Sequence, residues 1–257
     1  MNPTRRPPTM YASAHALNAP DGRRLVCCCD LPDGPIQPGG QVALVPGAGM
    51  SAHTLVYMSF LLASNGFSVV RIDGRDNVGL GEGMVEDWRI STVEQDLRLV
   101  LEEHPSSRVV ALGTAFWPTV RCLAETPGHS AVLVSPELDA REDGATGQDL
   151  HELVERVSVP VTMVVGEHDP ASQADSMSRV RDFVGGQATV ISVPGALAAF
   201  SRHAGMTQQL VAAVVAALAS TQTDAVAGFD VLSFDDCIRA MSEALPRRNE
   251  IVFDYRA

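Results

Sequence analysis

Three carboxylate residues, Asp76, Glu137 and Asp169, each follow a short apolar segment that we expect to be a buried strand. Because ligands of open α/β sheets bind outside the carboxyl ends of the strands, these side chains are predicted to converge on one crevice. Carboxyl groups crowded beside an apolar pocket have raised pKa values, which suits general acid or base catalysis. We therefore predict all three as candidate catalytic residues. The alternatives are that Asp169 only accepts hydrogen bonds from loop amides and that Glu137 is only solvated.

Arg75 lies in a segment, 73–77, that is rich in polar groups for a loop after a buried strand. Its guanidinium could bind a carboxylate or a phosphopantetheine-type anion of a substrate. The alternative is an ion pair with Asp76 or Asp87.

His53 follows a Gly-Ala-Gly loop and is a second candidate for acid–base chemistry in the pocket. The alternative is that this segment only opens a helix, with Ser51 or Thr54 as the capping residue.

Apolar runs that alternate with helical periodicity must position these residues. The expected strands lie near 9–17, 25–30, 41–46, 68–73, 108–114, 131–136, 161–166 and 188–194. The expected helices lie near 53–64, 92–103, 119–125, 173–183 and 206–218. Alternation of this kind predicts an α/β fold, with a mostly parallel sheet and helices on both of its faces.

Two segments depart from this alternation and define the predicted domain organisation. Residues 1–223 form the core, in which the polar stretch 137–158 is expected to be a short cap insertion over the carboxyl edge of the sheet. Residues 224–257 form a C-terminal extension with a helix near 233–245 and an edge strand near 250–255. Such an extension would pack on the core or form a homodimer by strand pairing.

The segment 109–117 resembles the strand–turn–helix of α/β-hydrolases, in which Gly-x-Ser-x-Gly lifts a nucleophilic serine above the sheet. Here the frame reads Gly113-Thr114-Ala115-Phe116-Trp117. The resemblance puts Ala115 at the position of the nucleophile, and a methyl group cannot attack a carbonyl carbon.

Other segments carry the same resemblance, which spans about residues 22–220. The loop 44–50 is similar to the one that supplies an oxyanion-hole amide, and the loop 165–170 to the one that carries the triad acid, here Asp169. More narrowly, residues 65–80 resemble the acyl-transferase/thioesterase of bacterial luminescence operons. The resemblance implies an α/β-hydrolase fold with about eight strands.

The triad histidine of the family should follow the last strand, in a Gly-x-x-His setting. This sequence has Gly195-Ala-Leu-Ala198, so Ala198 stands at the histidine position. The alternative is that His203, five residues later, re-enters the site. With two of three triad members replaced, we predict against hydrolysis through an acyl-enzyme.

The pocket implied by the resemblance has several candidate substrate-binding residues. Phe116 and Trp117 stand where small residues are expected, so that either the turn is relaxed or the aromatic rings line an apolar pocket. Thr114 is a candidate substitute hydroxyl. The full candidate set is Ala48, Met50, Ser51, His53, Arg75, Thr114, Ala115, Phe116, Trp117 and Ala198.

Composition excludes several classes of function. The formal net charge of −12 over 257 residues disfavours nucleic acid and anionic membrane as partners, and the absence of lysine excludes Schiff-base chemistry. No apolar run reaches the roughly 18 residues of a membrane span, and no apolar region follows the N-terminal charges as in a secretory signal. The odd number of cysteines, five, favours reduced thiols in the cytoplasm. We expect no cofactor and no metal.

Together these observations favour a non-hydrolytic enzyme that uses a hydrolase-like cavity on an apolar polyketide- or acyl-derived intermediate. Cyclisation, isomerisation or elimination requires shape, desolvation and a few hydrogen bonds rather than a covalent nucleophile. Two alternatives remain: a catalytically silent binding or partner protein, and an acyl hydrolase or thioesterase with a rearranged site.

Overall fold

The fold is described from a computed structural model. It describes residues 11–32, 34–36, 40–105, 107–126, 128–137, 156–157, 161–169, 188–193 and 204–220. Most of the predicted cap insertion, the predicted helix near 173–183, Ala198, His203 and the extension 224–257 lie outside these residues.

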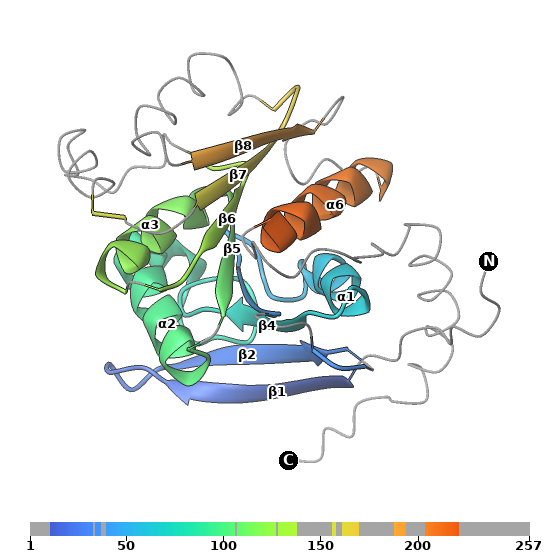
Figure 1. Ribbon diagram of the computed structural model, residues 1–257. Coiled ribbons are helices and arrows are strands. Elements are labelled where there is room, and N and C mark those ends of the chain that lie inside the picture. Colours follow the sequence, from blue (N-terminus) through green and yellow to red (C-terminus); the bar gives the residue numbers. More distant parts are fainter. Residues whose placement is uncertain are drawn as a thin grey trace.

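The described strands form one eight-stranded sheet with the order β1-β2-β4-β3-β5-β6-β7-β8 (Figure 1). Strand β2 is antiparallel to both of its neighbours, β1 and β4, and the other neighbouring pairs are parallel. The strands are β1 (Tyr11–Asn18), β2 (Arg24–Leu31), β3 (Gln41–Val45), β4 (Ser68–Asp73), β5 (Arg108–Leu112), β6 (Ala131–Val134), β7 (Val161–Gly166) and β8 (Ala188–Val193). The predicted mostly parallel sheet of about eight strands is confirmed, including the leading strand at its edge.

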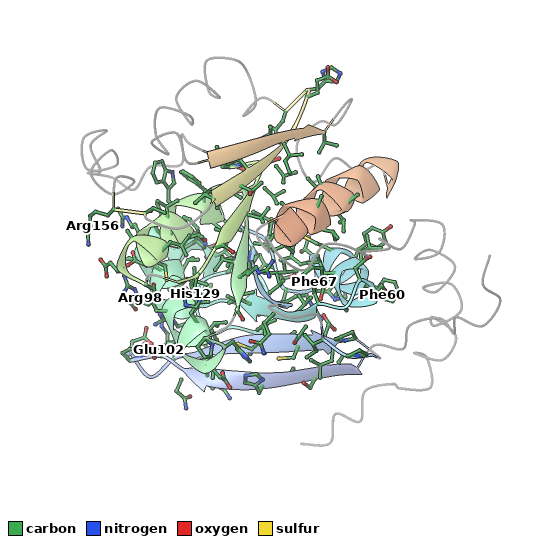
Figure 2. All side chains as sticks on the ribbon, viewed as in Figure 1. Phe60, Phe67, Arg98, Glu102, His129 and Arg156 are labelled. Atoms are coloured by element: carbon green, nitrogen blue, oxygen red, sulfur yellow. The ribbon has the colours of Figure 1, made fainter. Side chains whose placement is uncertain are left out.

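Helices cover both faces of this sheet (Figure 1). They are α1 (Val56–Ser64), α2 (Ile90–Glu103), α3 (Phe116–Glu125) and α6 (Ala204–Ser220). Helices α2 and α3 share one hydrophobic cluster with the sheet, and α1 and α6 share a second cluster on the opposite face. Figure 2 shows that side chains fill both layers.

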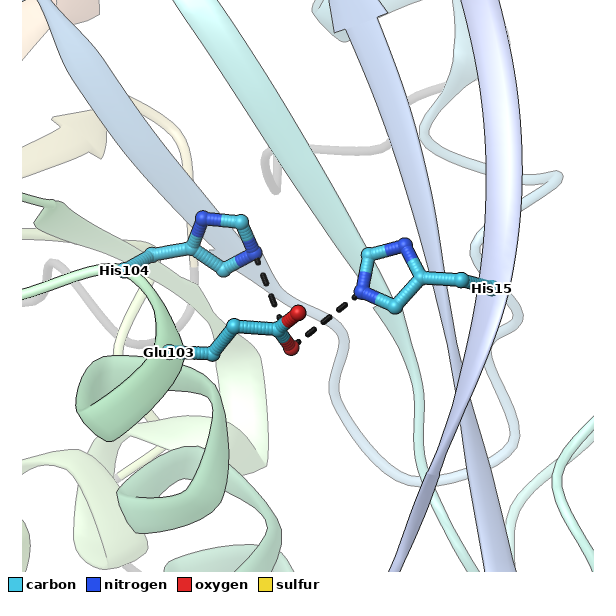
Figure 3. Close-up of side chains that lie close together, drawn as sticks. All are labelled: His15, Glu103 and His104. Atoms are coloured by element: carbon cyan, nitrogen blue, oxygen red, sulfur yellow. Dashed lines mark hydrogen bonds and ion pairs between the residues drawn. The ribbon is translucent and has the colours of Figure 1, made fainter.

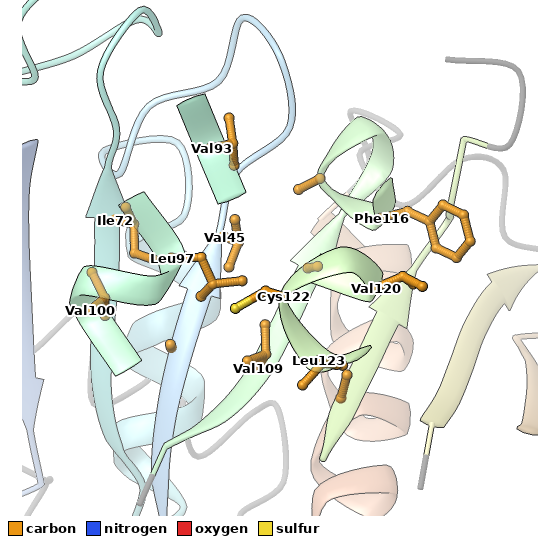
Figure 4. Close-up of a cluster of buried hydrophobic side chains, with 14 of the residues drawn as sticks. Val45, Ile72, Val93, Leu97, Val100, Val109, Phe116, Val120, Cys122 and Leu123 are labelled. Atoms are coloured by element: carbon orange, nitrogen blue, oxygen red, sulfur yellow. The ribbon is translucent and has the colours of Figure 1, made fainter. Parts of the chain in front are cut away.

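Continuous burial of the central strands explains why their sequences are runs of valine, isoleucine and leucine. Every residue of β4, β5, β6 and β7 is buried, which is typical of parallel strands covered on both faces. On α2, by contrast, the buried positions Ile90, Val93, Leu97 and Val100 recur every three to four residues and form one stripe against the sheet (Figure 4). Each such side chain contributes about 1.5–3 kcal/mol through burial.

Among the described residues, no helix has the length and apolar character needed to cross a membrane.

Candidate active site

The turn after β5 contains the one sharp change of direction that the sequence frame predicted, but at a different residue. Gly113 has a φ of +56°, whereas Ala115 has an ordinary right-handed φ of −66°. The left-handed residue at the carboxyl end of the strand is therefore Gly113, two residues before the predicted position. Glycine adopts this conformation without the steric cost that a Cβ imposes.

The loop after β3 approaches this turn closely. A Cβ added to Gly47 would lie 2.9 Å from the carbonyl oxygen of Leu112, so only glycine fits there. The next amide, of Ala48, donates a hydrogen bond of 2.7 Å to Oγ1 of Thr114. The first hydroxyl after the turn is thus held by the loop that was predicted to supply an oxyanion-hole amide.

Asn77 fixes the same loop from the other side. Its Oδ1 accepts a hydrogen bond of 2.9 Å from the amide of Gly49, and its Nδ2 donates one of 3.1 Å to the carbonyl oxygen of Gly47. Asn77 is buried, and both ends of its side-chain amide are satisfied by loop backbone. Sequence reasoning did not select Asn77 individually, although its place in a polar loop after a buried strand was a usable signal.

Glu137 and Asp169 lie at the same edge of the sheet as Gly113. Strands β5, β6 and β7 are neighbours, with Leu112 opposite Val134 and Val134 opposite Val164, so the residues that follow them emerge side by side. The amide of Glu137 donates a hydrogen bond of 3.2 Å to the carbonyl oxygen of Gly113.

The Glu137 carboxylate lies over the turn itself. Its Oε1 is 3.2 Å from the point where a Cβ of residue 113 would stand. A carboxylate oxygen thus borders the space into which a nucleophilic side chain would project from this turn.

Comparisons with known proteins show which solved structures share this architecture. No family model matches the chain, and no curated protein matches it, but 926 solved chains match its structure. An α/β serine hydrolase homologue from Coxiella burnetii has a TM-score of 0.65 at 16% identity, covering 82% of this chain and 99% of its own. The chain has the α/β-hydrolase fold. Because a fold that is so widely shared serves many functions, the function has to be argued from the site.

Two further structures with the α/β-hydrolase fold show the range of its neighbours. Est1E from Butyrivibrio proteoclasticus, solved with ferulic acid bound, has a TM-score of 0.63 at 15% identity over 83% of this chain and 100% of its own. A thioesterase domain from the curacin biosynthetic pathway has a TM-score of 0.61 at 13% identity over 82% and 99%. These identities are low, and the likeness is therefore one of fold.

Within the α/β-hydrolase fold the family motif places the nucleophile on the sharp turn between strand and helix. The φ of Gly113 marks that turn, and glycine carries no nucleophilic side chain. Ala115 is instead the N-cap residue of α3 and is fully buried in the cluster beneath that helix. The sharp turn therefore lies at Gly113 rather than at Ala115, and neither residue has a nucleophilic side chain.

Arg75 does not face a substrate, and the predicted anion clamp is wrong. Its guanidinium is 1% exposed and forms ion pairs with Asp96 on α2, at 2.7 Å, and with Asp21 in the β1–β2 turn, at 2.6 Å. Burial raises the pKa of Asp96, and hydrogen bonds from Arg75 oppose that rise. The alternative of an ion pair was right, but its predicted partners, Asp76 and Asp87, were wrong. The observed partners are distant from Arg75 in the sequence.

Asp76 is also engaged in structure rather than exposed to a crevice. It is buried, has a left-handed φ of 56°, and forms an ion pair with Arg23. This pair joins the loop after β4 to the β1–β2 turn. The geometry therefore removes Asp76 from the candidate catalytic residues and leaves the buried Asp169 and Glu137, whose exposed side chain agrees with the solvated alternative.

Phe116 and Trp117 lie in the hydrophobic cluster between α3 and the sheet, not in a pocket. Their rings are 1% and 3% exposed and form an edge-to-face pair with centroids 4.6 Å apart. Figure 4 shows Phe116 within this cluster. The prediction that these rings line an apolar pocket is wrong, because α3 begins at Phe116 and turns both side chains inward.

The segment after Met50 forms a turn closed by two hydroxyl groups. Ser51 and Thr54 contact each other at 3.2 Å, and each also accepts a hydrogen bond from the other's amide. The helix begins only at Val56, so the exposed His53 lies in the turn before it. Met50 packs partly against the α1/α6 cluster. These contacts favour the alternative that this segment opens a helix, although Ser51 and Thr54 cap the turn rather than the helix.

Asp169 is 4% exposed and follows β7 directly, with its amide bonded to the carbonyl oxygen of Gly166. A buried carboxylate at this edge retains the position that the resemblance gave to the triad acid. Ala198 and His203, the two candidates for the histidine position, lie outside the described residues.

Proposed function

We propose that this protein is a non-hydrolytic enzyme of the α/β-hydrolase fold that acts on an apolar polyketide- or acyl-derived intermediate without a covalent serine intermediate. The observation that supports this most is the position of Glu137 beside Gly113. The turn that presents a nucleophile in hydrolases has no side chain, and a carboxylate borders the vacated space.

A carboxylate at this position suits proton transfer. Glu137 would remove a proton from a carbon next to a carbonyl group, and the electron pair would move onto the carbonyl oxygen. Return of the proton at another carbon completes an isomerisation. Attack of the enolate carbon on a second carbonyl of the same molecule forms a ring and an alkoxide, and transfer of the proton from Glu137 to that alkoxide completes a cyclisation. Neither reaction changes the mass of the substrate or needs an acyl-enzyme.

The Thr114 hydroxyl is placed to stabilise the developing oxyanion. Its oxygen already accepts a hydrogen bond from the Ala48 amide, so its own proton can be donated to a substrate carbonyl oxygen. A hydrogen bond of this kind is strengthened when the donating hydroxyl itself accepts another. Donors that are preorganised toward developing charge are often the largest contributors to catalysis.

Exposed apolar side chains in the loop after β4 support an apolar substrate. The loop that follows Asn77 presents several of them to solvent, namely Val78, Leu80, Met84 and Val85. Exposed apolar side chains that gather in one loop are characteristic of binding surfaces. The neighbouring thioesterase domain from a biosynthetic pathway fits an acyl-derived substrate, which stays part of the proposal.

The proposal is tested by comparing, with high-resolution mass spectrometry, the metabolites of the source strain and of a clean deletion of this gene. We expect an intermediate to accumulate that the purified protein converts to a product of identical mass. Loss of water would indicate elimination, which remains within the proposal. Release of an acyl group would contradict it and would indicate a hydrolase in which His203 completes the site.

If no intermediate accumulates, the proposal fails and a silent binding or partner protein is favoured. Deletion of residues 224–257 would then be expected to disturb the phenotype and the oligomeric state, while pocket substitutions would not.

A further inference from the structure

A second cluster of chemically active side chains lies where β1 meets the end of α2. His15 comes from the edge strand β1, and Glu103 and His104 come from the last turn and the end of α2. Figure 3 shows both imidazole rings turned toward the Glu103 carboxylate. Because α2 leads into the start of β5, this cluster lies at the amino-terminal edge of that strand, away from the candidate active site.

We propose that His15, Glu103 and His104 form a binding site for Zn²⁺. One potential ligand atom from each residue lies within 4.8 Å of those of the other two. Nε2 of His15 is 3.2 Å from Oε2 of Glu103, and Nε2 of His104 is 4.0 Å from the same oxygen.

These separations are close to those of a metal site. Ligands at roughly 2.1 Å from a tetrahedral Zn²⁺ stand about 3.4 Å apart. The His15–Glu103 pair already has this spacing, and the His104–Glu103 pair must close by roughly half an ångström. The ligand atoms of the two histidines lie within 4.8 Å of each other. Side-chain rotation alone supplies a change of this size.

The state of His104 is an independent sign of a missing ligand. Its Nε2 is buried and has no hydrogen-bond partner among the described residues. A buried ring nitrogen without a partner costs free energy, and a metal ion would accept its lone pair.

The surroundings of the cluster favour a cation. His104 is the C-cap residue of α2, and the C-terminus of a helix carries partial negative charge. Sγ of Cys29 lies 3.9 Å from Nδ1 of His15, the ring nitrogen that the proposed metal does not use. A partner on the second ring nitrogen orients a metal-ligating histidine.

The ligand types select the ion. Two imidazoles and one carboxylate suit Zn²⁺, whereas Mg²⁺ and Ca²⁺ prefer oxygen ligands. The Glu103 side chain is 40% exposed, so water can take the fourth position. No sequence motif predicts this cluster, because 88 positions separate His15 from Glu103.

The test uses untagged, full-length protein stripped with a chelator, titrated with Zn²⁺ in competition with a chromogenic chelator. We expect one tight site, which is weakened at least tenfold in His15→Asn, Glu103→Gln and His104→Asn. The matched controls Glu102→Gln and His168→Asn change an exposed carboxylate on the same helix and an exposed histidine elsewhere, and should leave binding unchanged. Mg²⁺ should not compete.

Two further readouts separate this site from adventitious binding. Co²⁺ in place of Zn²⁺ should give a spectrum without a thiolate-to-metal charge-transfer band. Zn²⁺ at a hundredfold excess over its Kd should raise the Tm by roughly 5–10 °C, because the ligands come together only in the folded chain. A tight site that survives all three ligand substitutions, or that is lost in Cys29→Ser with a thiolate band, would overturn the proposal.

Discussion

Oε1 of Glu137 lies 3.2 Å from the point where a Cβ of residue 113 would stand, and residue 113 is a glycine in the left-handed conformation. This relationship joins two features that are 24 positions apart in the sequence. The sharp turn after β5 has no side chain at Gly113, and the next strand of the sheet places a carboxylate beside it. The predictions below depend on this arrangement and on the contacts that hold it.

The absence of a nucleophile on this turn predicts that the protein will not react with serine-directed reagents. The native protein should show no labelling by a fluorophosphonate and no turnover of simple acyl esters above background, measured by mass spectrometry and by chromogenic assay. An active serine esterase serves as the positive control. Stoichiometric labelling of any residue in the native protein would contradict the account, and labelling of Thr114 would identify the hydroxyl held by Ala48 as the nucleophile.

The buried ion pair between Arg75 and Asp96 predicts a large loss of stability in Asp96→Asn. The substitution removes the negative charge of Asp96 beside the buried Arg75 guanidinium, which lowers the free energy of unfolding by about 3–5 kcal/mol. The matched control is Glu94→Gln on the same helix, which removes a more exposed ion pair with Arg98 and should cost about 1 kcal/mol or less. Urea denaturation measures both. Equal losses would show that the Arg75 pair does not hold the loop after β4.

Cys27 predicts a loss of stability at alkaline pH. Burial raises the pKa of this thiol to about 12, whereas the unfolded chain has a pKa near 9. The folded state therefore holds the proton more tightly, so the stabilisation is fully present below about pH 9 and falls as the pH rises toward 12.

Urea denaturation at pH 8 and at pH 10.5 checks this prediction. Wild type should lose stability between the two values, and Cys27→Ala should lose less. Cys122→Ala removes a second buried thiol from the same cluster, at a position distant in sequence. Its loss of stability between the two pH values is compared with that of Cys27→Ala. An identical pH dependence in wild type and Cys27→Ala would show that Cys27 does not set it.

Much of the fold could be predicted from the sequence because the central strands are covered on both faces. Burial on both sides demands uninterrupted apolar runs, such as 68–73 and 161–166, and these stand out in any sequence. The leading strand was also found, since its turn residues 18–22 mark a hairpin. Helix starts were displaced by two to three residues, as at Val56 and Phe116, because neither helix begins with a side-chain cap that the sequence could reveal.

The site could be predicted only in part. The candidate residues after β5, β6 and β7 lie at one edge of the sheet, as predicted, but the sharp turn falls at Gly113 and not at Ala115. The pattern Ala111-Leu112-Gly113-Thr114-Ala115, with small residues on both sides of a glycine, was the signal that could have placed it. The partners of Arg75 could not be found in the same way, because Asp21 and Asp96 approach it only through the packing of three separate segments.

The substitution Glu137→Gln tests the central claim most directly. The rate at which the Glu137→Gln protein converts the intermediate that accumulates in the deletion strain should be compared with the rates of wild type and of Glu167→Gln. The control Glu167→Gln changes an exposed carboxylate after β7. General acid–base groups typically contribute about 10²–10⁴-fold to rate, so we expect a loss of kcat of that size in Glu137→Gln alone. The Tm of Glu137→Gln should equal that of wild type, and the product that wild type forms should have the mass of the intermediate. A Glu137→Gln enzyme as fast as wild type would contradict the account and place the chemistry on another residue.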